Sequence, residues 1–155
     1  MKKKKKPDIR SMIRMLMGSS DNPATIARGF AVGIFVAFSP LLGLHTFLAI
    51  FLAFLARGNR LASLLASWIC NPLSMIPILY FDFKVGEIFL STSIPFPENI
   101  HTLKDIIHAG SQVAWPLLVG GHLIGLVLGL ASFPIINYLV AYLRRDKKVT
   151  GPNVD

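Results

Sequence analysis

Nine polar or helix-breaking residues lie within or beside long apolar stretches of the 155-residue chain. Proline and glycine interrupt helices, and the amide groups that begin a broken helix carry partial positive charge that suits an anion. Arginine beside such helix ends would bind a phosphate-bearing headgroup, and transporter sites are often built from broken helices. The candidate binding residues are Ser39, Pro40, Gly43, His45, Arg57, Asn59, Arg60, Asn71 and Pro72.

Five of these residues also have a structural interpretation, which the sequence leaves open. Arg57 and Arg60 can anchor the chain at a membrane surface, His45 can be a hydrogen-bonded packing residue, and Asn71-Pro72 can be a satisfied helix kink. Under the binding interpretation, the breaks at Ser39–Gly43 and at Asn71-Pro72 should meet, because carbonyls freed by proline need partners in an apolar medium. We then expect Asn71 to reach the backbone of the first break, with both arginines nearby.

Catalytic and metal-binding patterns are weak. No acidic residue lies in the long apolar runs, so only His45 and His122 offer acid–base groups there. The chain has no phosphate-binding glycine loop and no Gly-x-Ser-x-Gly motif, and Cys70 has no neighbouring histidine. We expect no enzyme activity, no cofactor and no metal. Four residues do share a helical face at metal-ligand spacing, but the polar side of an interfacial helix is the favoured interpretation of Glu98, His101, Asp105 and His108.

Composition indicates an integral membrane protein. Hydrophobic residues make up 53% of the chain and charged residues only 15%, whereas soluble domains have about 25% charged residues. The charges are clustered, and three runs have none: 29–56, 61–81 and 106–143. Because a helix needs about 20 apolar residues to cross a bilayer, the predicted fold is an all-α membrane protein.

The first apolar run is basic at both ends, which predicts a hairpin. Basic residues in short loops stay on the cytoplasmic side, so a single crossing would place one basic end outside. We expect a broken, re-entrant hairpin with helices at 25–38 and 43–57. The alternative is one long helix kinked at Pro40.

Two main crossings should follow the hairpin. The first of them is broken at Asn71-Pro72, and the second is interrupted at Gly120-Gly121-His122 and at Phe133-Pro134. The net negative segment at about 84–112 would be the outside loop that joins them. Both termini would then be cytoplasmic.

The N-terminal arm is predicted to lie on an anionic membrane surface. Residues 9–17 place apolar side chains on one helical face beside a lysine run, and no nucleic-acid-binding module accompanies that run, so nucleic acid is not an expected partner. Asn22 should cap the first membrane helix, with Pro23 as its first residue. The expected parts are a basic arm at 1–22, a membrane domain at 23–143 and a basic tail at 144–155. The membrane-surface residues are Lys2, Lys3, Lys4, Lys5, Lys6, Arg10 and Arg14.

Four spaced motifs stand out in the apolar runs: Gly29-x-Ala31-x-Gly33-x-Phe35-x-x-x-x-Pro40, Gly43-x-His45, Arg57-x-Asn59-Arg60 and Trp68-x-x-Asn71-Pro72. Together they resemble a bacterial family called domain of unknown function 2062, over most of residues 20–143. The resemblance implies a small multi-pass protein of the bacterial inner membrane. Some members of that family look like fusions with glycosyltransferase-type domains, which implies a place near envelope glycan or lipid-carrier metabolism.

Two functions fit these expectations. The first is binding or translocation of an anionic amphiphile, such as a phospholipid or a polyprenyl phosphate, with membrane lipids as the partners. The alternative is a non-transporting scaffold that recruits a glycosyltransferase or another envelope enzyme, or associates with itself. Under the alternative, the breaks serve packing, and Gly125, Gly129 and Ala131 make helix contacts.

Overall fold

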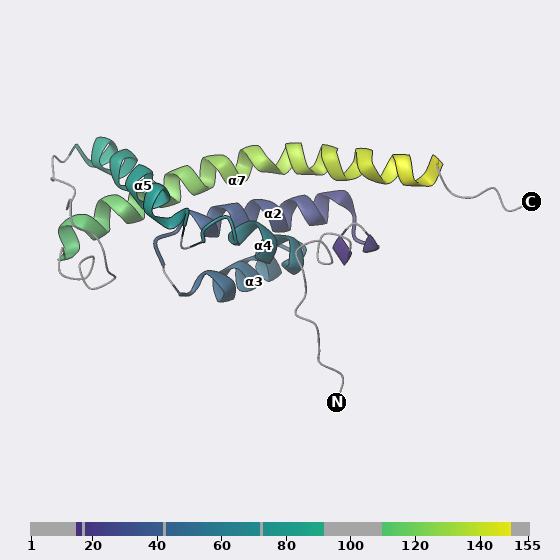
Figure 1. Ribbon diagram of the computed structural model, residues 1–155, viewed down its shortest axis with the longest axis horizontal. Coiled ribbons are helices and arrows are strands. Elements are labelled where there is room, and N and C mark those ends of the chain that lie inside the picture. Colours follow the sequence, from purple (N-terminus) through teal and green to yellow (C-terminus); the bar gives the residue numbers. More distant parts are fainter. Residues whose placement is uncertain (1–14, 17, 42, 72, 92–109, 150–155) are drawn as a thin grey trace, which may run out of the picture.

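Every regular element in the described part of the chain is an α-helix. The computed structural model describes residues 15–16, 18–41, 43–71, 73–91 and 110–149. The predicted all-α class is confirmed for these residues. The helices are α2 (Pro23–Ala37), α3 (His45–Leu55), α4 (Arg60–Ser67), α5 (Met75–Leu90) and α7 (Gly110–Val149) (Figure 1).

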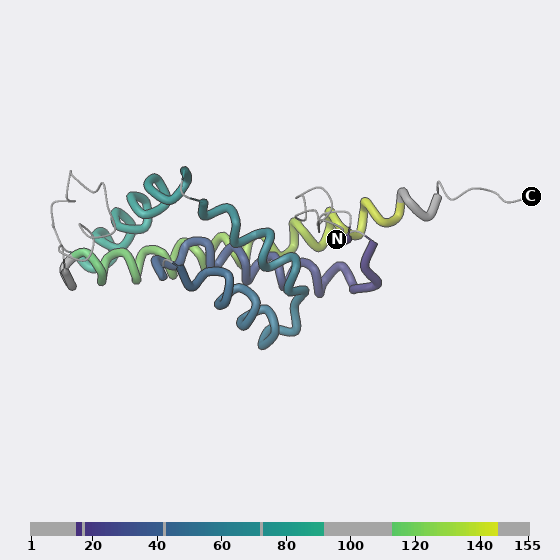
Figure 2. Tube along the Cα trace, turned by 60° about the horizontal axis from the view of Figure 1, so that its bottom comes forward, coloured from purple at the N-terminus to yellow at the C-terminus, as the bar shows by residue number. Residues whose placement is uncertain are grey.

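The long helix α7 runs the length of the molecule, and the other helices are arranged along it. α5 packs against its N-terminal half, and α2 packs against the part that follows (Figures 1 and 2). α3 and α4 pack on α2 and on each other. Two separate helices therefore cover successive parts of α7 along its length.

The first apolar run folds into two helices that turn back on each other, as the hairpin prediction required (Figure 1). α2 begins after the predicted cap residue Asn22, whose side chain accepts a hydrogen bond from the amide of Ala24 at 3.1 Å. The helix ends before Pro40, and the chain turns through Gly43, whose φ of +87° is left-handed and suits glycine. One continuous kinked helix is thereby ruled out.

The second apolar run is also broken where predicted. α4 ends at Ser67 and α5 begins at Met75, and α5 extends away from α4 along the length of the molecule (Figure 1). α5 continues to Leu90, so residues 84–90, which were expected in the outside loop, belong to this helix.

The last apolar run is continuous, so the predicted interruptions are wrong. α7 has 40 residues, and Pro116 and Pro134 both lie inside it. A proline removes one backbone hydrogen bond and bends a helix, but tertiary packing can carry the helix through. The pair Gly120-Gly121 is also helical and makes close contacts with other segments instead of breaking the chain.

Glycines allow the helix backbones to approach closely. A Cβ added at Gly29 would overlap the backbone of Asn59, the residue before α4, and a Cβ added at Gly33 would overlap the backbone of Ser63 within α4. A Cβ at Gly125 or Gly129 would lie 2.8 or 2.9 Å from a backbone oxygen of α2. The predicted helix contacts of these last two glycines are confirmed, whereas Ala131 is exposed.

Among the described residues, one helical stretch, Val113–Arg145, is long and apolar enough to cross a membrane. α2 and α3 are apolar but shorter. The second predicted crossing consists of the two halves α4 and α5, of 8 and 16 residues, so helix length alone does not establish it. This finding is consistent with membrane association and leaves the number of crossings open.

Some predicted features lie outside the described residues. They belong to the N-terminal basic arm, to the second break and to the segment before α7. They are Lys2, Lys3, Lys4, Lys5, Lys6, Arg10, Arg14, Pro72, Glu98, His101, Asp105 and His108.

Candidate functional site

The first break, residues 38–44, is closed by an internal hydrogen bond. Nε2 of His45, the first residue of α3, lies 2.8 Å from the carbonyl oxygen of Ser39. Because a carbonyl can only accept, the ring nitrogen is the donor and carries the proton. The hydroxyl of Ser39 is buried and has no hydrogen-bond partner among the described residues.

The second break, residues 68–74, is also stabilised from within. Oδ1 of Asn71 accepts hydrogen bonds from the amides of Leu73 at 2.9 Å and Ser74 at 3.0 Å, as in an Asx turn. The Ser74 hydroxyl donates to the carbonyl of Ile69 at 2.5 Å. The expected hydrogen bond from Asn71 to the first break is not formed in the described part of the chain, because this side chain serves the turn that leads into α5.

The arginine connector, residues 57–60, lies at the opposite end of α3 from the first break (Figure 1). α3 has 11 residues, which span about 16 Å at the helical rise per residue. Arg57 and Arg60 were predicted to lie near the first break. The structure instead places them at the far end of α3. Arg57 is exposed at the left-handed residue that follows α3, with φ of +52°. The Arg60 guanidinium lies 5.1 Å from the centroid of the Phe54 ring.

Asn59 holds the connector in place. Its Oδ1 accepts a hydrogen bond from the amide of Ala62 at 2.8 Å and so caps α4, while its Nδ2 donates to the Asp21 carboxylate at 2.5 Å. Like His45 and Asn71, it directs its polar atoms at the protein itself. Three of the nine candidate residues thus have a clear structural role.

Arg28 is a basic residue beside the connector that sequence reasoning did not assign to the site. A Cβ at Gly58 would lie 2.6 Å from the amide nitrogen of Gly29 and 3.1 Å from the carbonyl carbon of Arg28. This close approach places Arg28 and Arg57, both exposed, at the same end of the hairpin. In the sequence, a glycine follows each of these arginines, and this pattern could have indicated that the two backbones approach closely at this point.

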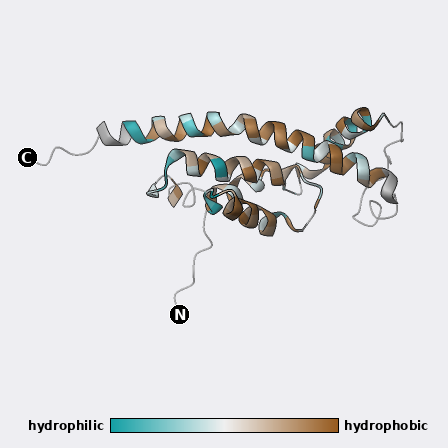
Figure 3. Ribbon diagram, turned by 180° about the vertical axis from the view of Figure 1, so that it is seen from behind, coloured by the Kyte–Doolittle hydropathy of each residue, from teal (hydrophilic) through white to brown (hydrophobic). Residues whose placement is uncertain are grey.

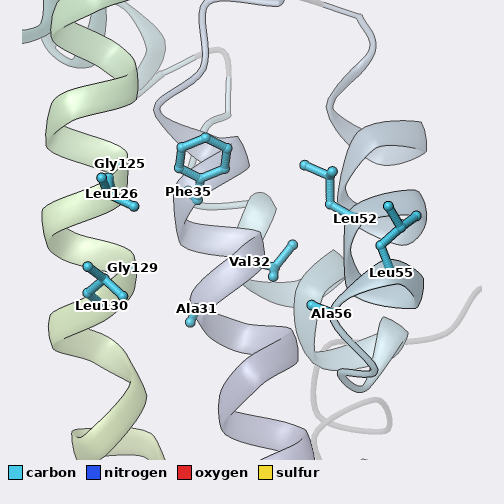
Figure 4. A pocket seen from close by; sticks show the side chains of 10 residues that line it. All are labelled: Ala31, Val32, Phe35, Leu52, Leu55, Ala56, Gly125, Leu126, Gly129 and Leu130. Atoms are coloured by element: carbon cyan, nitrogen blue, oxygen red, sulfur yellow. The ribbon is translucent and has the colours of Figure 1, made fainter.

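An apolar groove of about 490 Å³ crosses α2 between α3 and α7 (Figure 4). Its volume falls within the range of about 300–1,000 Å³ that is typical of small-molecule sites. At one end the wall residue Ala56 is followed directly by Arg57, and the wall residue Val32 lies one helical turn from Arg28. The groove is lined by, among others, Val32 and Phe35 of α2, Leu52 and Leu55 of α3, and Gly125 and Leu126 of α7.

Asp82 of α5 is a buried acid that directly follows the apolar run 61–81 and that sequence reasoning did not assign to a site. Its residue is only 1% exposed, and neither carboxylate oxygen has a hydrogen-bond partner among the described residues. The signal in the sequence was the apolar character of residues 83, 85 and 88–90, which continues the run beyond the aspartate.

These features define a class: an all-helical protein with a broken hairpin, one helix of membrane-spanning length, and an apolar groove that ends beside two arginines. The chain belongs to the bacterial family DUF2062, described as an uncharacterized protein conserved in bacteria, whose model matches residues 8–148. The resemblance inferred from the motifs is confirmed. Comparisons with curated proteins and with solved structures gave no match.

Proposed function

We propose that the protein is a multi-pass protein of the bacterial inner membrane that binds, and moves, an anionic amphiphile of the phospholipid or polyprenyl-phosphate type. The apolar tail would occupy the groove, and the phosphate would bind Arg28 and Arg57 at its basic end. The observation that carries this proposal is the continuity of the groove wall at Ala56 with Arg57. The proposed role is non-enzymatic.

Exposed apolar surface supports the membrane setting. Phe47, Leu73 and Leu130 are 65%, 90% and 67% exposed, and most residues of α3 and of the middle of α7 are hydrophobic (Figure 3). Apolar surface on this scale marks a membrane or protein contact. In this setting α7 crosses once, α4 and α5 form a second, broken crossing, and the α2–α3 hairpin enters and leaves on the cytoplasmic side.

Arginine chemistry supports an anionic headgroup. The guanidinium group binds phosphate oxygens through two parallel hydrogen bonds, and both arginines are exposed at the end of the groove. Asp21, the acid that reaches this region, is held by Asn59. Arg28 donates within α2 to the Ala24 carbonyl at 3.4 Å and to the Thr25 hydroxyl at 3.3 Å, both in exposed positions that a phosphate can reach, and no ion pair holds either arginine among the described residues.

The test is native mass spectrometry of the protein after gentle detergent extraction. The wild type should retain a phosphate-bearing lipid, and Val32→Trp, which fills the groove, should lose it. Val127→Trp is the matched control, because Val127 is 64% exposed on α7 and lies outside the groove. Circular dichroism should show both variants folded.

The headgroup contact is tested separately. Arg28→Gln with Arg57→Gln should reduce the retained anionic lipid, whereas Arg145→Gln, at an exposed position near the end of α7, should not. Equal retention by Val32→Trp and Val127→Trp would refute the groove as the binding site. A retained envelope enzyme in place of a lipid would favour the scaffold function.

A further inference from the structure

Asp82 is buried and has no hydrogen-bond partner among the described residues, so its negative charge needs a bound proton or cation to compensate it. Both carboxylate oxygens lack a hydrogen-bond partner in the described part of the chain. An ionised carboxylate removed from water costs several kcal/mol unless a cation or hydrogen-bond donors compensate. Ionisable groups at membrane depth mark ion and proton pathways.

The surroundings of Asp82 are rich in oxygen acceptors. A Cβ at Gly121 of α7 would lie 3.2 Å from Asp82 Oδ2 and would overlap the carbonyl oxygen of Phe38. The carboxylate and this carbonyl therefore approach the same point on α7. Phe38 caps the C-terminal end of α2, where the helix dipole places partial negative charge. Ser39 follows directly, with its buried and unpartnered hydroxyl.

The glycine pair on α7 creates this meeting point. A Cβ at Gly120 would overlap the Asp82 carbonyl oxygen and lie 2.6 Å from the amide nitrogen of Gly86. With side chains at these two positions, α5 and the end of α2 could not both reach α7. The close approach thus brings the Asp82 carboxylate of α5 and the Phe38 carbonyl at the end of α2 to the same point on α7, and Ser39 is the next residue of the chain.

The charged and titratable groups on the neighbouring elements are engaged elsewhere. On α5, Lys84 is paired with Glu87 at 2.9 Å. His45 of α3 binds the Ser39 carbonyl, and His122 of α7 lies 2.7 Å from the Leu118 carbonyl. Cys70 in the second break is a free thiol and brings no positive charge. Within the described chain, no ion pair supplies Asp82 with a cation.

We propose that Asp82, the Phe38 carbonyl and the Ser39 hydroxyl form a binding site for a small monovalent cation, either a proton or Na⁺. All three groups provide the hard oxygen atoms that such a cation prefers, and broken-helix carbonyls bind Na⁺ or protons in transporters. The site lies one helical turn beyond the groove along both α2, from Phe35 to Phe38, and α7, from Gly125 to Gly121. It does not depend on what fills the groove.

Infrared spectroscopy of the protein in lipid nanodiscs tests the site. The wild-type spectrum minus that of Asp82→Asn should contain the bands of the Asp82 carboxyl group, and these bands should change with pH or with Na⁺. For a proton, its protonated band should give way to the ionised band as the pH is raised, with no effect of Na⁺. For Na⁺, the ionised band should shift when NaCl replaces choline chloride at constant pH.

A matched pair of serine variants tests the neighbouring hydroxyl. Ser39→Ala should lower the affinity of the site for the proton or for Na⁺ about threefold to tenfold, which is the effect of losing one hydrogen bond. Ser132→Ala should change neither, because the Ser132 hydroxyl donates to the Gly129 carbonyl, within α7. A carboxyl band that stays constant over the whole pH range, with and without Na⁺, would overturn the proposal.

A second measurement uses the wild type alone, in case Asp82→Asn does not fold. A group that binds a proton only in the folded state stabilises at low pH and loses this contribution as pH rises. Tm should therefore fall on raising the pH, or rise with Na⁺ relative to choline. A Tm that responds to neither would overturn the site, while lipid retention measured on the same samples reports on the groove separately.

Discussion

Replacing Gly120 by alanine should separate α5 from α7 and destabilise the protein. The new Cβ would overlap the Asp82 carbonyl oxygen, a backbone atom that cannot rotate away. The two helices must move apart, which loosens the small core formed by Phe83, Val113 and Leu117. The substitution therefore tests whether the backbones are as close as the structure shows.

The expected magnitude follows from two opposing effects. Alanine gains about 1 kcal/mol over glycine in a helix interior, whereas overpacking of a rigid contact costs about 1–3 kcal/mol or more. Because a backbone oxygen cannot move aside, the cost lies at the upper end of this range, and we expect a net loss in free energy of unfolding of about 2 kcal/mol. For a chain of this size, Tm should fall by about 4–8 °C.

The assay is thermal unfolding in mild detergent, followed by circular dichroism. Gly18→Ala is the matched control, since a Cβ at Gly18 would meet nothing within 4 Å, and it should leave Tm unchanged or raise it slightly. Equal stability of the two variants would refute the close α5–α7 packing, and with it the meeting point at Asp82.

Three further predictions concern the first break and the topology. Gly43→Ala should lower the free energy of unfolding by about 1 kcal/mol, although its surroundings are open, because its φ is +87°; an unchanged Tm would contradict this. His45→Phe should cost about 1–3 kcal/mol by leaving the first break's carbonyl unpaired, and His45→Gln, which keeps a donor, should recover part of the lost Tm. In a Cys70→Ala background, an impermeant thiol reagent applied to intact cells should label Ser91→Cys but not Arg57→Cys; labelling of the latter would exclude the re-entrant hairpin.

Local chemistry was the predictable part of this structure. Asn22 before Pro23 predicted a helix start because both residues act on neighbouring backbone groups, and the cap forms. The break at residues 38–44 followed from Pro40 and Gly43 in the same way. These effects depend on a few adjacent residues, which a sequence shows directly.

Packing determined the parts that sequence reasoning missed. α7 continues through Pro116, Pro134 and both predicted interruptions. Its packing against α5 and α2 supports the helix over much of its length. Asn71 was predicted to bridge two segments, but its own turn offered nearer amides. Asp82 was overlooked because its charge was taken as the end of the apolar run 61–81, whereas the packing of α5 against α7 buries this acid.

The spacing of glycines on α7 limits how this helix can change during evolution. Gly121, Gly125 and Gly129 recur every fourth residue and adjoin the backbone of α2, so larger residues there require the neighbouring helix to shift. Val127 and Leu128 are exposed between them and can exchange for other apolar residues at little cost. Selection should therefore keep these three glycines fixed while the exposed apolar residues between them change, giving a four-residue period of conservation along the apolar part of α7.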